Sequence, residues 1–131
     1  MPRTLLLVDD DKSVRDSLCY LLERHGYRVL PAENGTRGIA LAAENQIDGA
    51  LIDVHMPGVN GIAVCRALRD QAAKTGRPIA IWMMTGARTT EIIKAATEAG
   101  ALVVLAKPFD YADLFRRFEE QLGKPSGGGS G

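Results

Sequence analysis

The stretch Leu5-Leu6-Leu7-Val8-Asp9-Asp10-Asp11 decides the fold class of this chain. An apolar run without polar interruption is typical of a strand that is covered on both faces, and here acidic residues follow it directly. Runs of the same kind recur along the chain, so the sequence predicts five buried strands. After the first run at 5–8, they lie at 27–30, 50–54, 79–84 and 101–106.

The segments between these runs carry apolar side chains at intervals of three and four residues, which predicts amphipathic helices. An alanine-rich segment at 36–44 predicts one more helix. Because the crossover between two parallel strands is right-handed, the alternation of strand and helix predicts a parallel sheet with helices on both faces. The other helical stripes are Val14, Leu18, Leu21 and Leu22, then Ile62, Cys65, Leu68 and Ala72, then Ile92, Ile93, Ala96 and Ala99, and last Leu114, Phe115, Phe118 and Leu122.

Several residues mark expected helix ends. Ser13 and Asp16 have the spacing of a capping box at the start of the first helix. Gly26, Gly76 and Gly100 stand where three helices are expected to end, because glycine readily adopts the left-handed conformation of a helix C-terminus. These positions agree with the strand and helix boundaries expected from the apolar pattern.

Composition limits the function classes. The chain has 131 residues, of which 46% are hydrophobic, and its 16 basic and 16 acidic residues give a net charge of zero. A domain that binds nucleic acid usually has a surplus of basic residues, so this chain is not expected to bind nucleic acid. Cys19 and Cys65 are too few for a disulfide framework or a four-ligand zinc site. No apolar run is long enough for a signal peptide or a membrane span, which predicts a cytoplasmic domain at residues 1–123. Residues 124–131 are expected to be a flexible Gly/Ser tail, either a linker or a remnant of expression.

Chemically active residue types follow four of the five predicted strands: Asp9 and Asp10, then Asp53, Thr85 and Lys107. The carboxyl ends of parallel strands meet at one edge of a sheet, so these side chains are expected to converge. Clustered carboxylates need a cation, and oxygen ligands suit Mg²⁺. A carboxylate beside Mg²⁺ can attack phosphorus, while an ammonium and a hydroxyl stabilise the phosphoryl oxygens. The residues therefore predict phosphoryl transfer to an aspartate.

The chain resembles the receiver domains of two-component response regulators over residues 3 to about 122. That resemblance implies a flavodoxin-like (βα)5 fold, a doubly wound five-stranded parallel sheet with strand order 2-1-3-4-5. The motifs that carry it are Asp9-Asp10 after the first strand, Asp53 with Met56-Pro57-Gly58 and Gly61, Thr85-Gly86, and Lys107-Pro108-Phe109.

The resemblance implies a role for each site residue. Asp53 would accept a phosphoryl group from a histidine of a sensor kinase or of a phosphotransfer protein. Mg²⁺ or Mn²⁺ would be bound by Asp9, Asp10, Asp53 and the backbone carbonyl of His55. Thr85, Gly86 and Lys107 would receive the phosphoryl group. The chain would then be a switch for partner binding and not an enzyme, apart from self-phosphorylation and self-dephosphorylation. A homodimer through the last helix–strand–helix face is a further expectation, with no binding to a membrane.

Four positions are expected to modulate this chemistry: His55, Ala87, Val104 and Pro108. His55 would flank the phosphoryl group and tune hydrolysis of the acyl phosphate. Val104 stands where the family usually has an aromatic switch residue, so we expect a weaker conformational response or one carried by other residues. The Lys107–Pro108 peptide bond would be cis, as it is in the family.

Two alternatives stay open at this point. Asp9-Asp10-Asp11-Lys12-Ser13 also resembles the Asp-x-Asp-x-Ser/Thr start of haloacid-dehalogenase-like phosphatases, with Asp9 as the nucleophile and Thr85 in a second motif. Asp53 and its Met-Pro-Gly loop weigh against this interpretation, as does a length that leaves no room for a cap domain. An inactive pseudo-receiver is the other alternative, and the intact acidic set with Lys107 weighs against it.

Overall fold

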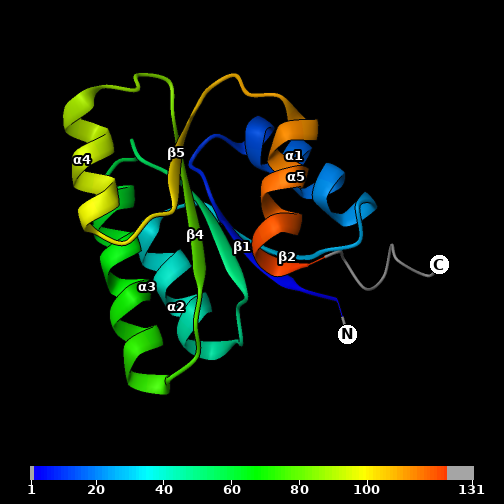
Figure 1. Ribbon diagram of the computed structural model, residues 1–131, viewed down its shortest axis with the longest axis horizontal. Helices are drawn as coiled ribbons and strands as arrows, with labels where there is room; N and C mark the ends of the chain where they lie inside the picture. Colours follow the sequence, from blue (N-terminus) through cyan, green and yellow to red (C-terminus); the bar gives the residue numbers. More distant parts are fainter. Residues whose placement is uncertain (1, 124–131) are drawn as a thin grey trace.

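The computed structural model describes residues 2–123, and in them five strands alternate with five helices (Figure 1). The predicted tail at 124–131 lies outside the described residues. The strands are β1 (Thr4–Val8), β2 (Arg28–Ala32), β3 (Gly49–Asp53), β4 (Ala80–Thr85) and β5 (Val103–Ala106). The helices are α1 (Lys12–Arg24), α2 (Gly35–Glu44), α3 (Gly61–Thr75), α4 (Thr90–Glu98) and α5 (Tyr111–Leu122).

All neighbouring strands are parallel, and their order is β2-β1-β3-β4-β5. The predicted fold class and strand order are confirmed. Val8 lies opposite Ile52 in the register of β1 and β3, so the next residue of each strand, Asp9 and Asp53, follows at the same level. The chain order reverses between these two strands, and such switch points are where open parallel sheets place their sites.

The sheet separates two hydrophobic cores, because successive side chains of a strand point to opposite faces. Leu5 and Leu7 pack with α1 and α5, whereas Leu6 and Val8 pack on the face covered by α2, α3 and α4. Figure 1 shows this division of the helices between the two sides of the sheet. Every strand residue of β1 is buried, as expected for a strand covered on both faces.

The predicted capping box at Ser13 and Asp16 is wrong. Asp11 is the N-cap of α1, and its Oδ1 accepts hydrogen bonds from the backbone N–H groups of Ser13 (2.9 Å) and Val14 (3.3 Å). The helix begins at Lys12, so Ser13 already lies within its first turn, and Asp16 pairs with Lys12 instead. The acid that directly precedes the helix therefore takes the capping role.

Most strand boundaries differ from the prediction by at most one residue, and two differ by two residues. The edge strand β2 continues through Pro31 to Ala32, because proline is tolerated at a sheet edge where no ladder bond is required of its nitrogen. β5 begins at Val103 instead of at residue 101, because the N–H of Ala101 donates to the carbonyl of Ala96 at the end of α4. The expected glycines do end their helices: Gly26, Gly76 and Gly100 all have positive φ angles.

None of the helices in residues 2–123 has both the length and the apolar character required to cross a membrane.

Phe118 on α5 is the aromatic centre of one core, and its replacement is expected to destabilise the fold. It is fully buried, with its ring 4.5 Å from that of Trp82. Phe118→Ala should lower the free energy of unfolding by about 3–5 kcal/mol, because it removes a large buried side chain and leaves a cavity. Urea denaturation followed by far-ultraviolet circular dichroism measures this. Tyr20→Ala, at a residue 60% exposed, should cost less than about 1 kcal/mol; equal losses would contradict the assignment of the core.

Candidate functional site

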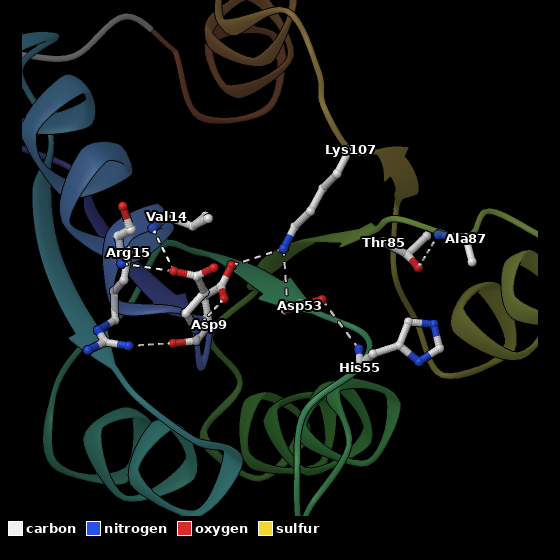
Figure 2. Close-up of polar contacts among 10 residues, drawn as sticks. Asp9, Val14, Arg15, Asp53, His55, Thr85, Ala87 and Lys107 are labelled. Atoms are coloured by element: carbon white, nitrogen blue, oxygen red, sulfur yellow. Dashed lines mark hydrogen bonds and ion pairs between the residues drawn. The ribbon is translucent and has the colours of Figure 1, made fainter.

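Lys107 joins two buried acids at the carboxyl edge of the sheet. Its Nζ lies 3.1 Å from Asp9 Oδ2 and 3.2 Å from Asp53 Oδ2. Figure 2 shows the lysine side chain extending from the end of β5 to the two carboxylates, with dashed lines to both. The three side chains come from the ends of β1, β3 and β5, so the strand topology alone brings them together.

Asp9, Asp10 and Asp53 form an acidic cluster. One carboxylate oxygen from each lies within 4.8 Å of the others. Asp9 and Asp53 are buried, while Asp10 is exposed. Burial raises the pKa of Asp53 above its usual value, the Lys107 ammonium lowers it, and the neighbouring Asp9 raises it again. Three carboxylates facing one ammonium leave the cluster short of positive charge.

The excess of negative charge also affects the pKa of Lys107. Burial alone would lower the pKa of its ammonium, but the facing carboxylates of Asp53 and Asp9 raise that pKa above its usual value. The lysine therefore stays charged in the site. A hard divalent cation fits the remaining oxygen donors, since Mg²⁺ prefers carboxylate oxygens and keeps several waters.

The acids of the pair after β1 differ in how firmly they are held. Asp9 Oδ1 accepts the backbone N–H of Asp11 (2.9 Å), its Oδ2 accepts the Lys107 ammonium, and its own backbone N–H donates to the carbonyl of Ala32 (3.2 Å). The Asp10 carboxylate, in contrast, has no hydrogen-bond partner within residues 2–123. Asp10 is thus the acid that can turn toward a cation without breaking an existing bond.

Thr85 lies at the end of β4 and is fully buried. Its Oγ1 accepts the backbone N–H of Ala87 (3.1 Å), and its carbonyl accepts the N–H of Lys107 (2.8 Å). A Cβ added at Gly86 would meet no atom within 4 Å, so there is open space beside Thr85. Gly86 follows Thr85 in the chain, and the end of β4 lies beside the end of β5, so the hydroxyl, the open space and the start of the lysine side chain are neighbours at this edge of the sheet.

Gly61 allows α3 to begin directly against Asp53. A Cβ built at Gly61 would lie 2.1 Å from the Asp53 carbonyl oxygen, which no side chain could accommodate without moving the backbone. The N–H of Gly61 donates to the carbonyl of Val54 (2.9 Å), and Asn60 caps the helix through the N–H of Ala63 (3.0 Å). This close approach fixes the backbone of the predicted phosphoacceptor.

The four positions predicted to modulate the site lie around it. His55 is exposed, its N–H donates to Asp53 Oδ1 (3.3 Å), and Figure 2 shows its ring pointing away from the Asp53 carboxylate. Val104 is buried on β5, and the Lys107–Pro108 peptide bond is cis as expected. The modulating roles of His55, Ala87, Val104 and Pro108 stay predictions.

Sequence reasoning missed Arg15. Its Nη1 donates to the backbone carbonyl of Asp9 at 2.7 Å, so a side chain from the first helix contacts the acidic loop (Figure 2). The available signal was slight: a basic residue near the start of a helix that follows several acids.

The fold and the acidic cluster with its bridging lysine define a receiver domain. Residues 5–119 match the response regulator receiver domain family, so the chain belongs to that family and acts in two-component signalling. This membership does not favour the phosphatase or the pseudo-receiver alternative.

Named relatives agree. The chain is 37% identical over 126 residues to the response regulator MprA of Mycobacterium sp. (strain KMS), a match that covers 96% of this chain and 53% of the relative. It therefore spans about half the length of the curated relatives it matches.

Solved structures agree as well. The chemotaxis protein CheY4 of Vibrio cholerae is similar with a TM-score of 0.84 and 30% identity, over 93% of this chain and 100% of that one. A response regulator of Burkholderia pseudomallei, solved with a phosphorylated aspartic acid, a calcium ion and citrate, has a TM-score of 0.78 and 26% identity, over 86% of this chain and 64% of that one.

Replacing Asp53 by asparagine should stabilise the fold at neutral pH. A carboxyl whose pKa is raised on folding contributes stability below its unfolded pKa and loses it as the pH rises through the folded pKa. Ionised Asp53 therefore opposes folding at pH 7, and Asp53→Asn removes that cost while Lys107 keeps its bond to Asp9.

Urea denaturation at several pH values tests this. The free energy of unfolding of Asp53→Asn should exceed that of the wild type at pH 7, and the difference should shrink as the pH falls toward about 4, the usual pKa of a carboxyl. Asp70→Asn, at an exposed position on α3, is the matched control and should follow the wild type. An Asp53→Asn variant less stable than the wild type at pH 7 would refute the electrostatic argument.

Proposed function

We propose that Asp53 is the phosphoacceptor of this receiver domain and that phosphorylation requires Mg²⁺ or Mn²⁺. The observation that carries the proposal is the Lys107 bridge between Asp9 and Asp53, with the free carboxylate of Asp10 beside it. The phosphorylated aspartic acid and calcium ion in the Burkholderia pseudomallei response regulator support it.

In this reaction one carboxylate oxygen of Asp53 attacks the phosphorus of a phosphohistidine. The new O–P bond forms as the N–P bond breaks, and its electron pair leaves with the imidazole nitrogen of the donor. Lys107 then exchanges its bond to Asp53 for a phosphoryl oxygen while staying near Asp9. Thr85 donates its hydroxyl hydrogen to a second phosphoryl oxygen, which its acceptor bond from Ala87 leaves free to do.

Asp10, Asp9, Asp53 and the backbone carbonyl of His55 would hold the cation. When bound, it supplies the positive charge that neutralises the phosphoryl oxygens. Asp10 is the most available direct ligand, because both oxygens of Asp9 already accept hydrogen bonds. Asp9 would then act mainly through water and by holding Lys107 in place.

The partner that supplies the phosphoryl group is a sensor histidine kinase or a histidine phosphotransfer protein, which places the domain in the cytoplasm. We infer that residues 1–123 are the receiver domain and that residues 124–131 are a linker or an expression remnant.

Leu102 beside β5 and Tyr111 on α5 are exposed apolar side chains, which supports the homodimer expected through α4, β5 and α5. Phosphorylation would switch binding on this face, with self-dephosphorylation resetting it.

Incubation with acetyl phosphate tests the phosphoacceptor directly by intact-protein mass spectrometry. The wild type should gain the mass of one phosphoryl group only when Mg²⁺ is present, because the acidic cluster repels a phosphate donor without it. Asp53→Asn should gain none, and Asp70→Asn should behave as the wild type. An adduct that persists in Asp53→Asn and is lost in Asp9→Asn would support the phosphatase alternative instead.

The exposed His55 side chain should influence the lifetime of the aspartyl phosphate. The His55 ring points away from Asp53 in this structure but is exposed and can rotate. An imidazole turned toward the acyl phosphate can assist the attacking water, so His55→Ala is expected to slow dephosphorylation by about threefold or more. The decay of the mass adduct after removal of acetyl phosphate measures the rate. His25→Gln, on the far end of α1, should leave it unchanged. An unchanged rate of dephosphorylation in His55→Ala would show that His55 is only an exposed loop residue without a role in hydrolysis.

A further inference from the structure

Arg15 contacts the acidic loop from the side opposite to Lys107. Its side chain lies in the first turns of α1 and is half-buried, and its Nη1 reaches back to the carbonyl of Asp9 at 2.7 Å. A guanidinium donating to an oxygen at this distance makes one of the stronger hydrogen bonds in proteins. The contact ties the start of the helix to the end of β1.

The carbonyl of Asp9 belongs to the same peptide group as the nitrogen of Asp10. A peptide group is planar, so holding the Asp9 carbonyl also fixes the plane that leads to the Asp10 Cα. The side chain of Asp10 has no bond of its own within residues 2–123, so its direction depends on this backbone. Arg15 therefore holds the peptide plane from which the unpaired Asp10 side chain extends.

We propose that Arg15 is a positioning residue that aims the Asp10 carboxylate at a divalent cation by holding the Asp9 carbonyl. The inference rests on the proposed function, since it assumes a cation at Asp10. The competing effect has the opposite sign: a guanidinium near the cluster repels a cation, so its charge alone would weaken binding. The direction of change on removing Arg15 decides between orientation and charge.

Mn²⁺ binding, measured by electron paramagnetic resonance on the full chain, is the first test. Arg15→Met keeps the apolar stem and removes the donor; it should weaken Mn²⁺ binding about tenfold, the lower end of the loss when a partner that orients a metal ligand is removed. Arg15→Lys, which retains a charged donor, should recover part of the affinity. Arg24→Met, the matched control on the same helix, removes the same charge away from the loop and should bind as the wild type.

A double mutant then shows whether Arg15 acts through Asp10. Arg15→Met in an Asp10→Asn background should weaken Mn²⁺ binding no further, because residues that act as one unit are not additive. In the acetyl phosphate reaction, the Mg²⁺ concentration at half-saturation should rise about tenfold while the rate at saturating Mg²⁺ stays within about twofold. A generally loosened fold would lower that rate as well.

Each outcome has a stated meaning. Unchanged or tighter Mn²⁺ binding in Arg15→Met overturns the proposal, and so does a full tenfold loss in the Asp10→Asn background. If circular dichroism shows that Arg15→Met does not fold, Arg15→Gln replaces it under the same criteria, since its shorter amide also loses the contact. Failure of the wild type to bind Mn²⁺, or binding that Asp53→Asn and Asp10→Asn leave unchanged, would reject the proposed function itself.

Discussion

The bridge that the half-buried ammonium of Lys107 makes between Asp9 and Asp53 is the interaction on which the rest of the site depends. Two buried carboxylates at the ends of adjacent strands repel one another, and the lysine is the cation that the chain provides for both. Its charge does not suffice for the whole cluster, because Asp10 adds a third carboxylate within 4.8 Å. The site therefore has an excess of negative charge, which a bound divalent cation or protonation of one acid would neutralise.

The sheet makes this arrangement unavoidable. The parallel order puts β1 beside β3, and their register sets Asp9 level with Asp53. β4 separates β3 from β5, yet the long lysine side chain spans that distance, while the bond from the Lys107 N–H to the Thr85 carbonyl fixes where it starts. Rigid strands hold the charged groups, a short loop at residues 9–11 brings α1 against them, and Gly61 lets α3 begin directly against Asp53. The site is thus precise because it is built on strand ends.

The sequence predicted the structure correctly where burial or strand topology alone determines the position of a residue. Buried strands such as β1 show as apolar runs, and the fixed hand of the crossovers then leaves few topologies. The strand-end residues Asp53, Thr85 and Lys107 followed from that topology. Contacts that depend on the reach of a side chain did not follow: Asp11 took the cap expected of Ser13, and Arg15 turned back to the Asp9 carbonyl. Pro31 hid the last residues of β2, because a break signal is harmless at a sheet edge.

The two neighbouring acids Asp9 and Asp10 illustrate how one loop divides two requirements. A site that must bind a cation reversibly needs one charge held firmly, so that the lysine does not drift, and one free to exchange water for metal. Asp9 meets the first requirement through the bonds to both of its oxygens, and Asp10 meets the second by remaining exposed. Exchanging their roles would bury an acid without a partner, at a cost that a small domain can hardly sustain. Asp9 directly follows the last residue of β1 and is buried, whereas Asp10 is one residue further on and is exposed. The order of the two acids therefore decides which of them pairs with Lys107.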